Sequence, residues 1–156
     1  MLKSPNEVLQ YSIDALNKET QLKFDMDNWY FDSKLMGGAM LSPHKVTNVC
    51  GTSACIAGTV AFQLDPKSTL SASTTVLKWA GVKLSDPWGS LNVFASDEEV
   101  ACDESLDRLF TVAAVYDSMY LEDVTKEDAI KTLSSLVSET TWVNLLARLQ
   151  RYITTE

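Results

Sequence analysis

The feature that most constrains the fold is the run of small and apolar residues from Ala54 to Leu64. At about 100° per residue, four very small side chains share one narrow face of a helix, which permits close packing; they are Ala54, Ala57, Gly58 and Ala61. The opposite side carries Ile56, Val60 and Leu64. A helix that is apolar on nearly all sides is a buried one. The sequence therefore predicts a buried central helix at 53–64, beginning at Ser53.

Both ends of this helix are marked. Thr52 is a good N-cap residue, and Gly51 gives the backbone conformational freedom just before it. The far end is closed by Asp65-Pro66, because a proline disfavours helical backbone in the residue before it.

Capping residues and apolar periodicity predict further helices. They cover about 5–17, 75–80, 96–116, 125–137 and 141–153. Aromatic and turn-forming residues at 24–31 favour a turn followed by a short extended piece, and 35–48 has the composition of a long surface loop. A short β hairpin near 29–49 is compatible with this pattern, and a turn is predicted at 86–89. The predicted fold class is mainly α, with about five or six helices around helix 53–64.

Length and composition favour one compact domain over residues 1–156, since the chain is 46% hydrophobic and no segment marks a boundary. The net charge of −8 argues against direct binding of nucleic acid or an anionic membrane, which need clustered Lys and Arg. No signal peptide or membrane span is evident, and Cys50, Cys55 and Cys102 suggest no disulfide framework. We therefore expect a cytoplasmic protein with reduced thiols, without a cofactor, and with a tendency to self-associate.

The acidic residues are concentrated in one segment. Residues 97–128 hold eleven acidic side chains and two basic ones. One interpretation is acids that favour helix starts and a solvated face. The other is an acidic surface, including Asp103, Glu104 and Asp107, that binds a basic host protein or imitates nucleic acid.

The start of the central helix is the first candidate ligand site. Gly51, Thr52 and Ser53 would offer backbone N–H groups and hydroxyls at the positive end of the helix dipole, which suits phosphate or carboxylate. Ordinary capping by Thr52 is the alternative, because the segment lacks the Lys and the extra glycines of a phosphate loop.

Cys50 is the only candidate nucleophile, and His44, the single histidine, is the only base of its type. This pair defines a cysteine-dependent enzyme as an alternative function. The other interpretation treats Cys50 and Cys55 as small buried hydrophobic residues. A zinc site formed by His44, Cys50, Cys55 and Cys102 fits poorly, since the spacing is at the edge of the usual range and half of it lies in a helix.

Asp25 and Trp29 are spaced for a tight turn that sets the indole ring against the central helix. Anchoring of the core is one role for this ring. Alternatively, Trp29, Tyr30 and Phe31 frame a pocket for a planar ligand together with the loop 35–48.

Two motifs resemble those of a large, poorly characterised group of small bacteriophage and bacterial proteins. They are Phe-Asp-Met-x-x-Trp at 24–29 and Cys-Gly-Thr-x-x-Cys-x-Ala-Gly at 50–58. The later order is also similar, with Ala80-Gly81-Val82, Leu109-Phe110, a helix capped by Thr125, and Trp142. The loop between the two motifs is longer here than in the usual pattern. The resemblance implies a phage or prophage origin and no particular activity.

The sequence thus favours a non-enzymatic accessory protein that binds a host protein or a small anionic, nucleotide-like ligand. Interference with host defence follows from the implied origin alone. The candidate ligand-binding residues are Asp25, Trp29, His44, Cys50, Gly51, Thr52 and Ser53, and the candidate partner-binding residues are Asp103, Glu104 and Asp107.

Overall fold

A computed structural model describes residues 1–35, 38–83 and 96–155. The α-helices are α1 (Pro5–Lys18), α2 (Ile56–Leu64), α3 (Ala72–Ala80), α4 (Asp97–Thr111), α5 (Lys126–Leu136) and α6 (Trp142–Leu149). The strands are β1 (Lys23–Phe24), β2 (Tyr30–Asp32), β3 (Ala39–Met40) and β4 (Thr52–Ala54). Short 3₁₀ segments are η1 (Pro43–Lys45), η2 (Val49–Gly51), η3 (Ala113–Tyr116), η4 (Leu121–Asp123) and η5 (Gln150–Thr155). The predicted turn at 86–89 lies outside the described residues.

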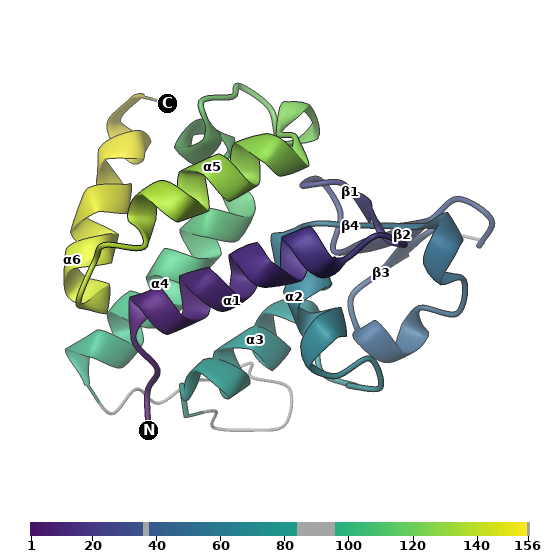
Figure 1. Cartoon of the computed structure of the whole chain (residues 1–156), viewed down its shortest axis with the longest axis horizontal. Helices are drawn as coiled ribbons and strands as arrows, with labels where there is room; N and C mark the ends of the chain where they lie inside the picture. The colour runs from purple at the N-terminus through teal and green to yellow at the C-terminus, as the bar shows by residue number, and fades with distance from the viewer. Residues whose placement is uncertain (36–37, 84–95, 156) are drawn as a thin grey trace.

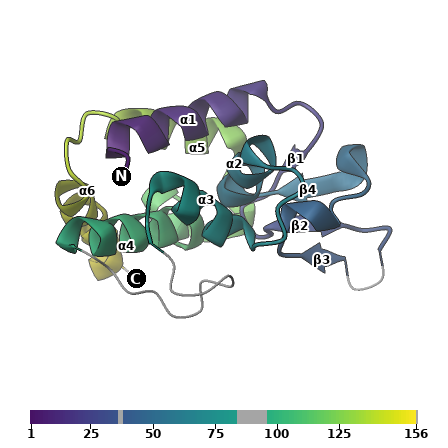
Figure 2. The same ribbon diagram turned by 90° about the horizontal axis from the view of Figure 1, so that it is seen from below.

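The molecule is mainly helical, with a small mixed sheet at one end (Figure 1). Helices α1 and α5 pack side by side on one side, and α4 lies on the other with α6 against it (Figures 1 and 2). Helix α2 contacts both α1 and α3. Its residues Ile56, Val60 and Ala61 are at most 1% exposed, which confirms the predicted burial of the central helix.

The predicted start of this helix is wrong. Helix α2 begins at Ile56 rather than Ser53, and Thr52 is not its N-cap. Residues Thr52–Ala54 instead form β4, which pairs with parallel β1 on one edge and antiparallel β2 on the other. The backbone polar groups of this segment are therefore used by neighbouring strands. Cys55 is the N-cap, and its thiol accepts the N–H of Gly58 at 3.3 Å.

The predicted hairpin near 29–49 is confirmed by the antiparallel pair β2–β3. The four strands form one sheet in the order β1-β4-β2-β3. The interpretation of 35–48 as one long surface loop is wrong in part, because β3 and η1 lie within it. The carbonyl of Leu41 accepts the N–H of Ala72, and the carbonyl of Ser68 accepts that of His44. These bonds attach the segment to the start of α3.

Most of the capping residues predicted from the sequence cap helices in the structure. Ser4, Ser96, Thr125 and Thr141 each accept a backbone N–H from the first turn of their helix, and Thr125 completes a capping box with Asp128. Gly81 ends α3 with φ +102°, a conformation that favours glycine. Three predicted bounds need correction. Helix α3 begins at Ala72 because Ser71 caps it. Helix α4 ends at Thr111, where Val112 is extended, and α6 changes to 3₁₀ geometry after Leu149.

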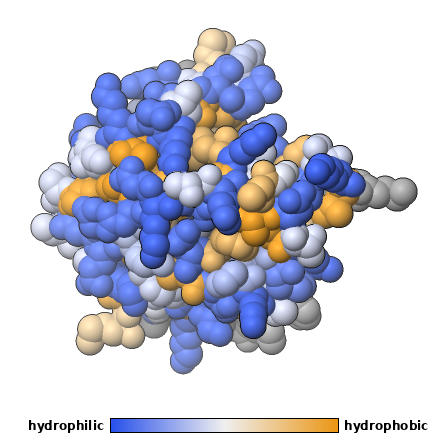
Figure 3. All heavy atoms as spheres, turned by 45° about the vertical axis from the view of Figure 1, so that its right-hand side comes forward, coloured by the Kyte–Doolittle hydropathy of each residue, from blue (hydrophilic) through white to orange (hydrophobic). Residues whose placement is uncertain are grey.

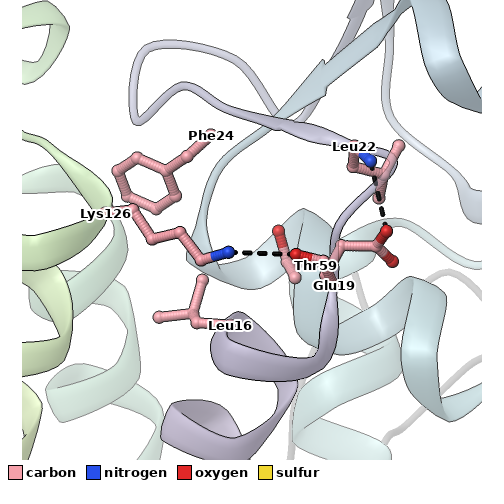
Figure 4. Close-up of a pocket in the computed structure, with 6 residues that line it drawn as sticks. All are labelled: Leu16, Glu19, Leu22, Phe24, Thr59 and Lys126. Atoms are coloured by element: carbon pink, nitrogen blue, oxygen red, sulfur yellow. Dashed lines mark hydrogen bonds between the residues drawn. The ribbon is translucent and has the colours of Figure 1, made fainter.

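The end of α1 is tied to α2 and α5 through Glu19 (Figure 4). Its carboxylate accepts the N–H groups of Gln21 (2.9 Å) and Leu22 (3.1 Å) and the side-chain amide of Gln63 (2.9 Å). The Nζ of Lys126 donates to the Glu19 carbonyl at 2.9 Å. The cavity beside these groups measures about 10 Å³, which is room for about one water molecule.

Glu19→Gln is expected to lower the free energy of unfolding by about 1 to 2 kcal/mol at pH 7, because hydrogen bonds to a charged group are stronger than neutral ones. Burial alone would raise the pKa of this carboxyl, but its hydrogen bonds outweigh burial and hold the pKa below its usual value. The advantage of the wild type is therefore complete above the unfolded pKa of about 4.3 and is lost as pH falls through the folded pKa. Urea denaturation of both proteins at pH 7 and under acid conditions measures this, and a difference independent of pH would contradict it.

Within residues 1–35, 38–83 and 96–155, no helix combines the length and hydrophobicity needed to cross a lipid bilayer.

Candidate functional groove

The two sequence motifs meet in the structure. The N–H of Asp25 donates to the carbonyl of Ala54 at 2.8 Å, and the N–H of Cys55 donates to the carbonyl of Asn28 at 2.9 Å. The Tyr30 hydroxyl, which is fully buried, donates to the carbonyl of Gly58 at 2.6 Å. A Cβ atom at Gly58 would overlap the carbonyl oxygen of Trp29. The glycine that ends the second motif is therefore what permits α2 to touch the turn formed by the first motif.

The turn at 25–29 is held by its own side chains. The Asp25 carboxylate accepts the N–H of Asp27 at 3.0 Å and the amide Nδ2 of Asn28 at 2.9 Å. This arrangement presents the half-buried ring of Trp29 to Phe110 of α4, with ring centroids 6.5 Å apart in an edge-to-face arrangement. The turn of the first motif and the end of α4 thus form one aromatic contact.

Two adjoining hollows lie beside this contact. The inner pocket has a volume of about 90 Å³ and is lined by Met26, Asp27, Asn28, Trp29, Cys55, Phe110, Thr111 and Leu121. The outer groove has a volume of about 360 Å³ and is lined by Asp27, Thr111, Ala113, Met119, Tyr120, Leu121 and Glu122. Because both are lined by Asp27, Thr111 and Leu121, the inner pocket and the outer groove adjoin one another.

The outer groove combines exposed apolar side chains with acidic ones. Met119 is 84% exposed and Tyr120 is 58% exposed, which is unusual for large apolar side chains. Asp27 and Glu122 are also exposed, and the described residues that line the two hollows include no lysine or arginine. The face at the sheet end is mostly polar with separate apolar patches (Figure 3). The outer groove is therefore acidic, with exposed apolar side chains in its lining.

The predicted acidic surface leads to this groove. Asp103, Asp107 and Thr111 are spaced by four residues and so share one face of α4, which ends where the groove begins. We call Asp103, Glu104 and Asp107 the acidic stripe. Partial burial, together with the charges of Asp107 and Glu104, raises the pKa of Asp103. Burial is the larger cause, and the like charges of Asp107 and Glu104 add to it.

The predicted planar-ligand pocket has different walls from those expected. Trp29 lines a pocket, but the other walls come from its own turn, the N-cap of α2, α4 and η4 rather than from the loop 35–48. Tyr30 lies in the core. Sequence reasoning did not single out Met119 and Tyr120, although two large apolar residues directly after Asp117-Ser118 were a readable signal of an exposed binding segment.

The predicted anion site does not have helix-terminus geometry. Gly51 lies in η2 and Ser53 in β4, and the Thr52 hydroxyl donates to the carbonyl of Asn48 at 2.6 Å. The first turn of α2 is capped by the Cys55 thiol instead. The N–H of Thr52 donates to the carbonyl of Val49, and Ser53 pairs with β1 and β2, so this segment does not form the free end of a helix.

Cys50 and His44, the predicted nucleophile and base, form no hydrogen bond with one another within the described part of the chain. Cys50 is exposed in η2. The His44 Nδ1 lies 3.2 Å from the carbonyl oxygen of Ser68. Cys55 and Cys102 are buried, and burial raises the pKa of Cys55 to about 11, which keeps that thiol protonated at neutral pH. Among described residues, no three His, Cys, Asp or Glu side chains gather to hold a metal ion.

No protein-family model, curated protein or solved structure matches this chain. The resemblance of the two motifs to phage and bacterial proteins therefore stays a prediction. The acidic stripe, the outer groove and the inner pocket are the features that indicate what the chain can bind.

Proposed function

We propose that this protein is a non-enzymatic binding protein that recognises a basic segment of a partner protein along the acidic stripe and the outer groove. The observation that carries the proposal is the junction at Thr111, where Asp103 and Asp107 lead into a groove containing Asp27, Glu122 and two exposed apolar residues. Complementary charge promotes association and selects partners. Exposed Tyr and Met side chains are enriched at protein interfaces.

A basic protein segment fits these features better than a small anion does. The groove carries acidic side chains, which repel phosphate and carboxylate groups. The predicted anion site is occupied by strand pairing and by the Cys55 cap. Of the two ligands expected from the sequence, the protein partner is therefore the one that we propose. The identity of a host protein and interference with defence stay predictions.

Selection from a random peptide library on the purified full chain tests this function. We expect the enriched peptides to be rich in Lys and Arg and to bind more weakly as salt is raised. Asp103→Asn, Glu104→Gln and Asp107→Asn together should weaken them about tenfold. Each exposed ion pair is worth at most about 1 kcal/mol, and about 1.4 kcal/mol is a factor of ten in affinity.

A matched control separates local charge from total charge. Glu7→Gln, Asp14→Asn and Asp65→Asn together change the net charge by the same amount at exposed positions that line neither hollow. Helix α1, which carries two of them, lies on the opposite side of the molecule from α4 (Figure 2). Equal weakening by both triple variants would show that only the overall charge matters, and unchanged binding by the stripe variant would reject the proposal.

A further inference from the structure

We propose that the inner pocket receives one aliphatic side chain of the basic partner segment, flanked in that segment by Lys or Arg residues that meet Asp27 and Glu122. This inference rests on the proposed function and adds to it the sequence type of the partner. The occupant is a segment of another protein chain, because complementary charge in the outer groove argues for a basic peptide.

The size of the inner pocket selects an aliphatic side chain. Its volume is about 90 Å³, whereas a cavity of about 150 Å³ is known to bind benzene. The inner pocket is therefore smaller than a cavity that is known to hold a six-membered ring. The side chains of Val, Leu, Ile and Met have three or four heavy atoms, fewer than the six of an aromatic ring. The pocket therefore fits a side chain of the first kind.

The chemistry of the walls points to the same occupant. Met26, Cys55 and Phe110 are each less than 9% exposed, so they form a fixed apolar lining that is present before binding. The Cys55 thiol is protonated at neutral pH and already accepts the Gly58 N–H, so this wall behaves as a weakly polar one. The ring of Trp29 is held on one side by its edge-to-face contact with Phe110.

The mouth of the pocket fixes which residues of the partner lie next to the aliphatic one. Asp27, Thr111 and Leu121 belong to both hollows, and Glu122 follows directly in the outer groove. Asp27 thus lies at the pocket mouth, and Glu122 lies beside it. A chain that inserts one side chain here places its neighbouring residues against carboxylates. Lysine or arginine at those neighbouring positions is the complementary choice.

Peptides of defined sequence test the inference on the full-length wild type. Nine-residue fluorescent peptides carry Lys, Arg, Ser and Gly around a central position that is Leu, Ala or Phe, and binding is measured by fluorescence polarisation. We expect the Leu peptide to bind about fiftyfold more tightly than the Ala peptide, because it buries about three more carbon atoms. The Phe peptide should bind more weakly than the Leu peptide because the ring exceeds the pocket.

A variant that closes the mouth connects the preference to this pocket. Thr111 is exposed at the mouth, so Thr111→Trp should abolish the difference between the Leu and Ala peptides while binding of the Ala peptide persists. Thr140→Trp, at an exposed position between α5 and α6, is the matched control and should keep the difference. If Thr111→Trp fails to fold by circular dichroism, the comparison of peptides on the wild type still decides.

The outcomes separate the inference from the function on which it rests. Equal affinity for the Leu and Ala peptides, or tighter binding of Phe, overturns the pocket assignment. In that case the proposed function survives if both peptides lose affinity on neutralisation of the acidic stripe. A Leu preference that persists in Thr111→Trp also overturns the assignment. Absence of binding by every peptide overturns both.

Discussion

Replacement of Gly58 by alanine is expected to lower the free energy of unfolding by about 3 kcal/mol, at the upper end of the usual cost of overpacking. Helix propensity predicts the opposite sign, since alanine is favoured over glycine in helices by up to about 1 kcal/mol. The reason for the reversal is that the new Cβ would overlap the backbone carbonyl oxygen of Trp29. A backbone atom held by a paired turn moves at greater cost than a flexible side chain.

Urea denaturation followed by circular dichroism measures this effect. Ser73→Ala, at a half-buried position within α3, is the control in which helix propensity acts without a clash, and it should leave stability equal or slightly higher. A Gly58→Ala protein as stable as the wild type would show that the two motifs are not in fixed contact. Because Trp29 lines the inner pocket, the same variant should also reduce the preference for the Leu peptide.

Local sequence signals predicted much of the helical part of the fold. The apolar circumference of 54–64 predicted a buried helix, which the structure confirms except for its start at 53. Ser4, Thr125 and Thr141 predicted helix starts that the structure also confirms. These features depend on residues within a few positions of one another, so a single sequence contains them. The hairpin near 29–49 was also predicted, because its two strands are close in the chain.

The start of α2 was not predictable on the same basis. Thr52 and Gly51 have the composition of a helix start, but parallel β1, about thirty residues earlier in the chain, pairs with 53–54. Strands of two or three residues carry too little periodicity to be detected, and the pairing is a tertiary contact. Cysteine is also not one of the preferred N-cap residues, so Cys55 gave no signal.

The candidate site was likewise predictable from the sequence only in part. Asp25, Trp29 and the acidic residues of α4 were selected from the sequence, and the structure brings the first motif and the end of α4 together at the groove. The sequence did not indicate that Phe110 and Leu121 face Trp29, because these residues are about ninety positions away along the chain. His44 and Cys50 were selected by residue type alone, and type does not determine contact.

Trp142→Ala is expected to be the most destabilising single substitution that we propose, at about 4 kcal/mol, within the range for removing a buried tryptophan. Trp142 is 2% exposed at the start of α6, and its indole Nε1 donates to the carbonyl of Lys3 at 2.8 Å. The N–H of Lys3 in turn donates to the carbonyl of Ala80 at 2.7 Å. One side chain therefore joins the beginning of the chain, the end of α3 and the last α-helix.

Trp142→Phe separates the two parts of this role, since the ring that remains fills most of the space but donates no hydrogen bond to Lys3. We expect a smaller loss of about 1 to 2 kcal/mol, made up of one buried carbonyl without its partner and a small cavity. Urea denaturation of the three proteins gives both values. Similar losses for alanine and phenylalanine would mean that the hydrogen bond, and not the volume, holds the N-terminal segment. A loss below about 1 kcal/mol for alanine would mean that α6 is not fixed to the N-terminal segment. The packing of α6 against α4 would then hold the C-terminal part of the fold without the contact to Lys3.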